Sequence, residues 1–200
     1  MEQRYSITTL EAIARKTLKA YDPSLLIGTP RAVPIEKIAR WLGLCIEYQC
    51  LRKNGAVLGE MVYDDTYVPM YFRDRKEYDL VLVKGKTIIL DESLLRCRGD
   101  GRLRFTCAHE VAEWLIHRAT YAGTGQTAAF INPKKGAETN PFMERQADIL
   151  ATFLLMPSAQ VKKAFYSIRN TTKDPAAVLA ELFDVSKQAM DIFMREHSLV

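Results

Sequence analysis

The spacing of hydrophobic and polar residues divides the chain into two helical regions with a β-rich region between them. Apolar residues recur every three or four positions over residues 8–21 and 34–42, which predicts two amphipathic helices. Threonines at the start of the first helix can cap it, and Gly43 can end the second. Helical spacing returns after residue 104 and dominates the rest of the chain.

The middle region, residues 44–90, consists of short β-branched and aromatic runs separated by turn residues. Lys84-Gly85 predicts a hairpin, and Asp64-Asp65 predicts a turn. We expect a small, mostly antiparallel sheet whose apolar face covers the next long helix, and a short helix at residues 91–95. The predicted strands are Leu44–Cys50, Ala56–Tyr63, Tyr67–Phe72, Leu80–Val83 and Thr87–Leu90.

Residues 105–117 combine an apolar helical face with a face of potential metal ligands. His109 and Glu113 are four residues apart, so they point the same way from successive turns and can reach one cation. Glu110 falls at the edge of this face, where a carboxylate can accept a proton from water. His117 lies on the same face but about 12 Å along the axis from His109, too far to share an ion whose bonds are about 2 Å long.

The motif formed here is H-E-x-x-E, whereas zinc peptidases carry H-E-x-x-H. A carboxylate at Glu113 can also ligate zinc, but it makes the site harder and more anionic, which favours manganese or iron. We therefore expect one divalent cation, with zinc as the first candidate and manganese or iron as alternatives. Taken alone, the same spacing also fits an ordinary polar helix face.

A second helix is predicted from residue 143 to the residues before Pro157, which disfavours helical geometry in its predecessor. Glu144 and Asp148 lie four apart on its polar face. A third ligand from this helix would complete a three-ligand site with one open position, as a catalytic metal requires. Asp148 could accept the free ring N–H of His109 and fix its tautomer. Without the first helix, the pattern would indicate an ordinary pair of solvated acids on a surface helix.

Two segments resemble the ImmA/IrrE family of metallopeptidases. Residues 104–110, Arg-Phe-Thr-Cys-Ala-His-Glu, resemble the family's R-F-T-x-A-H-E segment, and residues 144–157 resemble its E-x-x-A-(N/D)-x-x-A-x-x-L-L-M-P segment without a gap. The resemblance implies His109 as the first ligand and Glu110 as the catalytic base. It places Glu113 at the second ligand position and Glu144 at the third. His117 matches a histidine that has no ligand role in the family.

The resemblance also implies an α+β fold with a zincin-like helical core, a small sheet and a C-terminal segment similar to a helix-turn-helix. We assign residues 1–157 to a metallopeptidase-like domain and residues 158–200 to a helical segment packed on it. The implied activity is metal-dependent endopeptidase cleavage, typically of a helix-turn-helix transcriptional repressor in response to DNA damage or mobile-element signals. Because Glu113 departs from the pattern, the alternative is a non-catalytic module that binds a repressor or another partner without cleaving it.

The C-terminal pattern predicts helices at residues 159–168, 175–183 and after Ser186, which can cap the last one. Residues 179–190 resemble a helix-turn-helix, so DNA binding is one interpretation. However, Ala189, Ile192 and Phe193 need core neighbours, and few basic residues lie on this helix to meet phosphates. We therefore expect core packing.

Residues 119–140 show no sustained period and are interrupted by glycines and Pro133. A loop this long is usually functional or slack. The interpretations are a rim that shapes substrate access and a mere connection, and no residue within it stands out as a contact.

Charge and hydropathy narrow the possible partners. The 28 basic and 24 acidic residues give a net charge of +4, too small to indicate nucleic-acid binding. No run approaches the roughly 18 apolar residues of a membrane span, and the first residues lack the apolar stretch of a signal peptide, so we expect a cytoplasmic protein. A local basic cluster comprises Arg96, Arg98, Arg102 and Arg104. We interpret it as a solvated rim that could attract an acidic partner surface.

The cysteines indicate neither a zinc ribbon nor a redox dithiol, because none of them falls in a C-x-x-C pair. We expect isolated reduced thiols. Cys107 lies about 200° around the helix from His109 and should face away from the metal ligands. The four cysteines are Cys45, Cys50, Cys97 and Cys107.

Overall fold

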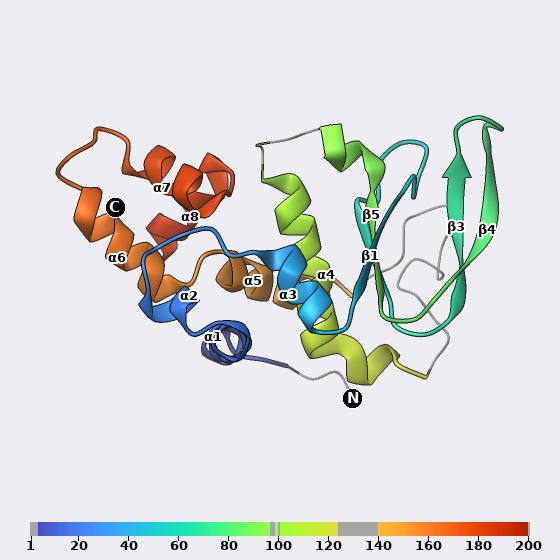
Figure 1. Ribbon diagram of the computed structural model, residues 1–200, viewed down its shortest axis with the longest axis horizontal. Coiled ribbons are helices and arrows are strands. Elements are labelled where there is room, and N and C mark those ends of the chain that lie inside the picture. The colour runs from blue at the N-terminus through green and yellow to red at the C-terminus, as the bar shows by residue number, and fades with distance from the viewer. Residues whose placement is uncertain (1–3, 97–98, 100, 124–139, 200) are drawn as a thin grey trace.

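The computed structural model describes residues 4–96, 99, 101–123 and 140–199 and confirms the α+β fold class (Figure 1). The strands lie at one end of the molecule and the C-terminal helices at the other, with α4 (Arg102–Tyr121) between them (Figure 1). The N-terminal elements are α1 (Ile7–Tyr21), α2 (Ser24–Ile27) and α3 (Ile35–Trp41). The strands are β1 (Cys45–Gln49), β2 (Gly59–Val62), β3 (Thr66–Phe72), β4 (Glu77–Val83) and β5 (Thr87–Asp91), followed by the 3-10 helix η1 (Glu92–Arg96).

The two long N-terminal helices form where the hydrophobic spacing predicts them. The apolar face of α1 is buried, and the helix packs along α5 (Pro141–Leu155). The cap differs from the prediction: the side-chain hydroxyl of Ser6, and not a threonine, accepts a hydrogen bond from the Thr9 backbone N–H at 3.1 Å. The chain leaves α3 through Gly43, whose φ of +81° is a conformation that glycine adopts without steric cost.

The five strands form two sheets. β5 pairs with β1 in parallel and with β2 in antiparallel orientation, whereas β3 and β4 form a separate antiparallel ribbon. The expectation of a mostly antiparallel structure is met in two of the three pairings. The three-stranded sheet contacts α4 through β2 and β5, so it covers that helix as expected.

The hairpin predicted at Lys84-Gly85 is wrong, because β4 and β5 belong to different sheets. All five residues of β5 are buried, so this strand needs a neighbour on each edge and lies in the middle of its sheet. Gly85 lies directly against backbone, since a Cβ at this position would come within 2.8 Å of Asp64 Cα. Its N–H donates to Asp65 Oδ1 at 2.9 Å. These contacts redirect the chain from the ribbon to the sheet.

Helices α4 and α5 form the centre of the molecule. Each buries a stripe that includes small residues, and Ala108, Ala112, Ala147 and Ala151 are all fully buried. Small side chains at an interface allow two helices to approach closely. Asn140 caps α5 by accepting a hydrogen bond from the Phe142 N–H at 3.0 Å, and the helix ends just before Pro157. This packing brings the polar faces of the two helices together.

Three helices, α6 (Ser158–Ile168), α7 (Pro175–Phe183) and α8 (Lys187–Glu196), follow α5. Ser186 caps α8 as expected. Phe193 is 1% exposed, so the last helix packs into the core, although Ile192 remains 42% exposed, contrary to the expectation that it needs core neighbours. Ile192 instead borders a mainly apolar cavity of about 260 Å³ beside the start of α4.

Arg104 links the C-terminal helices to the rest of the fold. Its guanidinium donates hydrogen bonds to the backbone carbonyls of Asp184 and Val33, each at 2.8 Å, and pairs with the Asp184 carboxylate at 3.2 Å. The prediction that Arg104 belongs to a solvated rim is therefore wrong. The arginine is largely buried because three chain segments meet around it.

The predicted loop and one of the four cysteines lie wholly or partly outside the described residues. Helix α4 continues to Tyr121, three residues into the predicted loop, and residues 124–139 lie outside the described part, so the rim remains a prediction. Cys97 also lies outside it, whereas Cys45, Cys50 and Cys107 are free thiols, and Cys107 is buried in the core. Among the described residues, no helix combines the length and hydropathy needed to cross a bilayer.

Candidate metal centre

His109 and Glu113 lie one turn apart on the face of α4 that meets α5. The His109 Nε2 atom is 3.8 Å from Glu113 Oε1. Glu113 is 7% exposed and His109 is partly buried, so both side chains are largely shielded from solvent. Their i, i+4 spacing on a regular helix places the two ligand atoms side by side, as the sequence predicts.

Glu144 reaches the same point from the first turn of α5. Its Oε2 atom is 3.3 Å from His109 Nε2. One ligand atom from each of His109, Glu113 and Glu144 lies within 4.8 Å of the other two, which is close enough for all three to bind one ion with bonds of about 2 Å. The structure therefore brings together the three residues that the sequence nominates as ligands.

Asp148 orients the imidazole from behind. Its Oδ1 atom is 2.9 Å from His109 Nδ1, one helical turn beyond Glu144 on α5. A carboxylate at Nδ1 favours the tautomer with its proton on that nitrogen and leaves Nε2 free as a ligand. The contact predicted from sequence is present, and both nitrogens of His109 face α5.

Glu110 is 4% exposed and lies between α4 and the start of β2. A Cβ added to Gly59 would be 2.3 Å from Glu110 Oε1 and 2.6 Å from Thr106 Cγ2, so the backbone of β2 lies directly on this carboxylate. Glu110 is not one of the three clustered ligands. It is a buried carboxylate that follows the candidate ligand His109 directly in the chain.

The carboxylates and the imidazole shift one another's protonation. Burial and the charge of Glu113 raise the pKa of Glu110 well above its usual range, and burial raises the pKa of Glu113 to about 7. Burial would lower the pKa of His109, but its hydrogen bonds to Asp148 and Glu144 outweigh burial and raise the pKa to about 11. The donor set therefore attracts positive charge strongly, which fits a divalent cation.

His117 lies two turns from His109 on α4 and takes no part in the ligand cluster. It is 3% exposed, and neither ring nitrogen has a hydrogen-bond partner within the described part of the chain. Burial lowers the pKa of His117 to about 4, so the ring stays neutral near pH 7. This agrees with the inference from helix geometry that it cannot share an ion with His109.

The sequence prediction missed the contribution of β2. Glu60 is 4% exposed, and its charge raises the pKa of both Glu110 and Glu113. Tyr63 lies just beyond the strand, and its hydroxyl donates to Glu113 Oε2. Burial and the Glu113 charge raise the pKa of Tyr63, so the phenol keeps its proton. A glycine and a lone acid in an otherwise apolar strand are the signals that point to close backbone approach and a buried charge.

The family comparison agrees with this site. The family model of the IrrE N-terminal-like domain, the peptidase M78 family, matches residues 71–195. The chain belongs to this family. The matched region runs from β3 to α8 and includes both ligand-bearing helices, while β2, with Gly59 and Glu60, lies before it. No curated protein matches the chain. Membership in this family gives the protein a metallopeptidase-type role.

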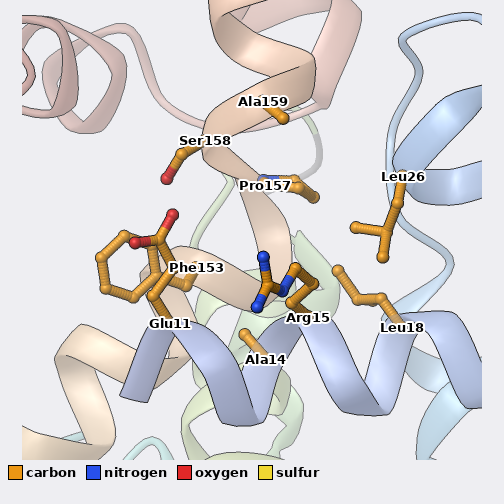
Figure 2. A pocket seen from close by; sticks show the side chains of 9 residues that line it. All are labelled: Glu11, Ala14, Arg15, Leu18, Leu26, Phe153, Pro157, Ser158 and Ala159. Carbon is orange, nitrogen blue, oxygen red and sulfur yellow. The ribbon is translucent and has the colours of Figure 1, made fainter. Parts of the chain in front are cut away.

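The ligand cluster fits a divalent cation in its donor chemistry, because an imidazole nitrogen and carboxylate oxygens are both ligands of such ions. A separate hollow of about 100 Å³ lies between α1, α2 and the junction of α5 and α6 (Figure 2). Glu11 and Arg15 of α1 border it, and none of the residues that line it is a candidate ligand. Within the described part of the chain, the candidate ligand cluster therefore lies between α4 and α5, apart from this hollow.

Proposed function

We propose that this protein is a metal-dependent endopeptidase of the ImmA/IrrE type. The observation that carries the proposal is the convergence of His109, Glu113 and Glu144 from two helices, with ligand atoms within 4.8 Å of one another. Family membership supports a peptidase role, and the buried carboxylate of Glu110 beside the cluster supports hydrolysis.

Each residue has a distinct task in this mechanism. His109, Glu113 and Glu144 would hold the cation, which when bound polarises a peptide carbonyl and makes water more acidic. Glu110 takes a proton from the attacking water on a carboxylate oxygen and returns it to the leaving amine. Burial raises the pKa of Glu110, so its carboxylate form is a stronger base than that of an exposed glutamate. Asp148 keeps the His109 ring in the tautomer that presents Nε2.

We further propose that the substrate is a helix-turn-helix repressor, that the cation is zinc, manganese or iron, and that the enzyme acts in the cytoplasm. The resemblance of residues 104–110 and 144–157 to the family's motifs supports this choice of substrate. The C-terminal helices pack into the core and carry few basic residues, so direct DNA binding is not part of the proposal.

The test is cleavage of a repressor encoded beside this chain, with the purified protein loaded in turn with Zn²⁺, Mn²⁺ and Fe²⁺. Intact repressor and its fragments are followed by mass spectrometry. Glu110→Gln keeps the side-chain shape but removes the base, so we expect the cleavage rate to fall about 10²–10⁴-fold while metal content is unchanged. Equal and complete survival of the repressor with wild type and Glu110→Gln under every metal would contradict the proposal.

A second candidate function is a pseudo-peptidase module that binds the repressor without cutting it. The observation that favours it is Glu113, a carboxylate where zinc peptidases carry histidine. Metal content after purification at neutral pH separates the two functions. Stoichiometric metal that is lost in Glu144→Ala supports the enzyme, whereas substoichiometric metal that does not change in Glu144→Ala, together with retained repressor binding, supports the module.

A further inference from the structure

Tyr63 contacts one oxygen of the Glu113 carboxylate, and His109 lies near the other. Its hydroxyl donates to Glu113 Oε2 at 3.5 Å, while Glu113 Oε1 is the oxygen that lies 3.8 Å from His109 Nε2. The two oxygens of one carboxylate are therefore divided between the ligand cluster and a phenol. Hydrogen bonds in unliganded sites are often long and shorten once the ligand binds, which is consistent with the length of this contact.

The phenol has little freedom to move. Tyr63 is 4% exposed, and its ring stacks on Trp114 at 6.2 Å and on Tyr121 at 5.3 Å between centroids. Both neighbours lie on α4, the helix that carries Glu113. On the outer side of Trp114, the guanidinium of Arg118 lies 4.5 Å from the ring centroid. The position of the hydroxyl is thus fixed by the packing of the Tyr63 ring against α4.

The same aromatic stack reaches the helix that supplies the third ligand. The Tyr121 hydroxyl donates to Met143 Sδ at 3.6 Å, and Met143 immediately precedes Glu144 at the start of α5. The segment after β2 also contacts the end of α4, where the Gly123 N–H donates to the Asp64 carboxylate. Tyr63 is therefore built into the contacts that hold the ligand-bearing helices together.

The chemistry of a carboxylate ligand explains why a donor is placed here. A ligand imidazole carries a second N–H and needs an acceptor behind it, as His109 has in Asp148. A ligand carboxylate has a second oxygen and needs a donor. A phenol is a neutral O–H donor near pH 7 and meets that need without adding charge to an acidic site.

We propose that Tyr63 is a positioning residue that holds Glu113 Oε2, so that Glu113 binds the cation through Oε1 alone. This inference rests on the metal site of the proposed function. It assigns to Tyr63, which lies before the region matched by the family model, a role suited to the carboxylate ligand of the H-E-x-x-E motif. Tyr63 acts through Glu113 and does not touch the reacting atoms.

The test is a double-mutant cycle on Mn²⁺ affinity, measured from the free-ion signal in electron paramagnetic resonance. The proteins are wild type, Tyr63→Phe, Glu113→Ala and the double variant. We expect Tyr63→Phe to weaken binding by about 10–100-fold in the wild-type background and to have no effect in the Glu113→Ala background. Tyr71→Phe on β3 is the matched control for loss of a buried tyrosine hydroxyl, because Tyr71 is 8% exposed, and it should bind Mn²⁺ as wild type does.

Cobalt substitution supplies a readout that altered packing alone would not change. The visible absorption of Co²⁺ weakens as its coordination number rises, so release of Oε2 in Tyr63→Phe should lower the absorption per bound cobalt. If wild type and Tyr63→Phe bind Mn²⁺ equally well, the role proposed for Tyr63 is wrong. The same holds if Tyr63→Phe weakens binding equally in the wild-type and Glu113→Ala backgrounds. Either result leaves the proposed function standing. Wild type that binds no divalent metal overturns the proposed function and this inference together.

Discussion

His109 is the residue on which the candidate site depends, because side chains of α5 contact both of its ring nitrogens. Asp148 lies at Nδ1 and Glu144 at Nε2. The sequence predicts these contacts because residues four apart on two helices leave few ways to arrange one imidazole and three acids. It does not predict Tyr63, because the register of a strand against a helix leaves no periodic signal in either segment.

At this scale, Asp148→Ala should weaken metal binding without removing a ligand. The imidazole loses the acceptor that fixes its tautomer and orientation, and loss of such a partner typically costs about 10–100-fold in metal affinity. Competition with a chromophoric chelator measures the change. Asp148→Asn, which keeps an acceptor oxygen, should retain more affinity than Asp148→Ala, and wild-type affinity in Asp148→Ala would contradict the role of this contact.

At the scale of elements, the helices follow from the sequence and the strand pairing does not. Apolar spacing is a local property and sets α1, α4 and α5 directly. The partners of β5 depend on burial, because a strand buried along its whole length must lie between two others. The turn residues Lys84-Gly85 show where the chain turns, but the contacts of Gly85 with Asp64 and Asp65 decide which sheet it enters.

The contact between β2 and α4 makes Gly59 the most sensitive position of this element pair. Gly59→Ala places a methyl group 2.3 Å from Glu110 Oε1 and 2.6 Å from Thr106 Cγ2, so β2 or the Glu110 carboxylate must move. We expect a loss of about 1–3 kcal/mol in the free energy of unfolding, measured by urea denaturation, and a lower cleavage rate. Thr106→Ser removes one of the two clashes and should restore part of the stability. A fully stable and active Gly59→Ala would contradict the close approach of β2 to Glu110.

At the scale of the whole molecule, the sequence predicts the fold class and the meeting of two helices, because the family motifs lie on both of them. The division of the chain at residue 157 stays a prediction. The attachment of the C-terminal helices through Arg104 could not be predicted, because its partners at Val33 and Asp184 are distant in sequence and two of the three contacts are to backbone carbonyls, which no side-chain pattern marks.

The charge of the whole centre predicts how metal binding depends on pH. The pKa of His109 is raised to about 11 from 6.5, so its proton stabilises the metal-free fold fully below pH 6.5, and this contribution disappears as the pH rises toward 11. A cation must displace that proton, and below pH 7 a second one from Glu113, whose pKa is about 7.

Mn²⁺ affinity should therefore rise by about tenfold per pH unit between pH 7 and 8 and more steeply between pH 5.5 and 7. Calorimetric titration in buffers of different ionisation enthalpy measures the protons released. Asp148→Ala should reduce the slope above pH 7, because the pKa of His109 then falls. A flat profile with no proton release would contradict the exchange.

The two contacts of α5 with the His109 ring bear on the order of folding and metal binding. With its ring protonated, His109 already joins α4 to α5 before any metal arrives, so the chain can reach its final shape first and be loaded later. Removal of the ion should likewise leave an intact, reloadable protein. The supply of metal in the cell, and not the folding of the chain, should then set the fraction of folded protein that carries an ion.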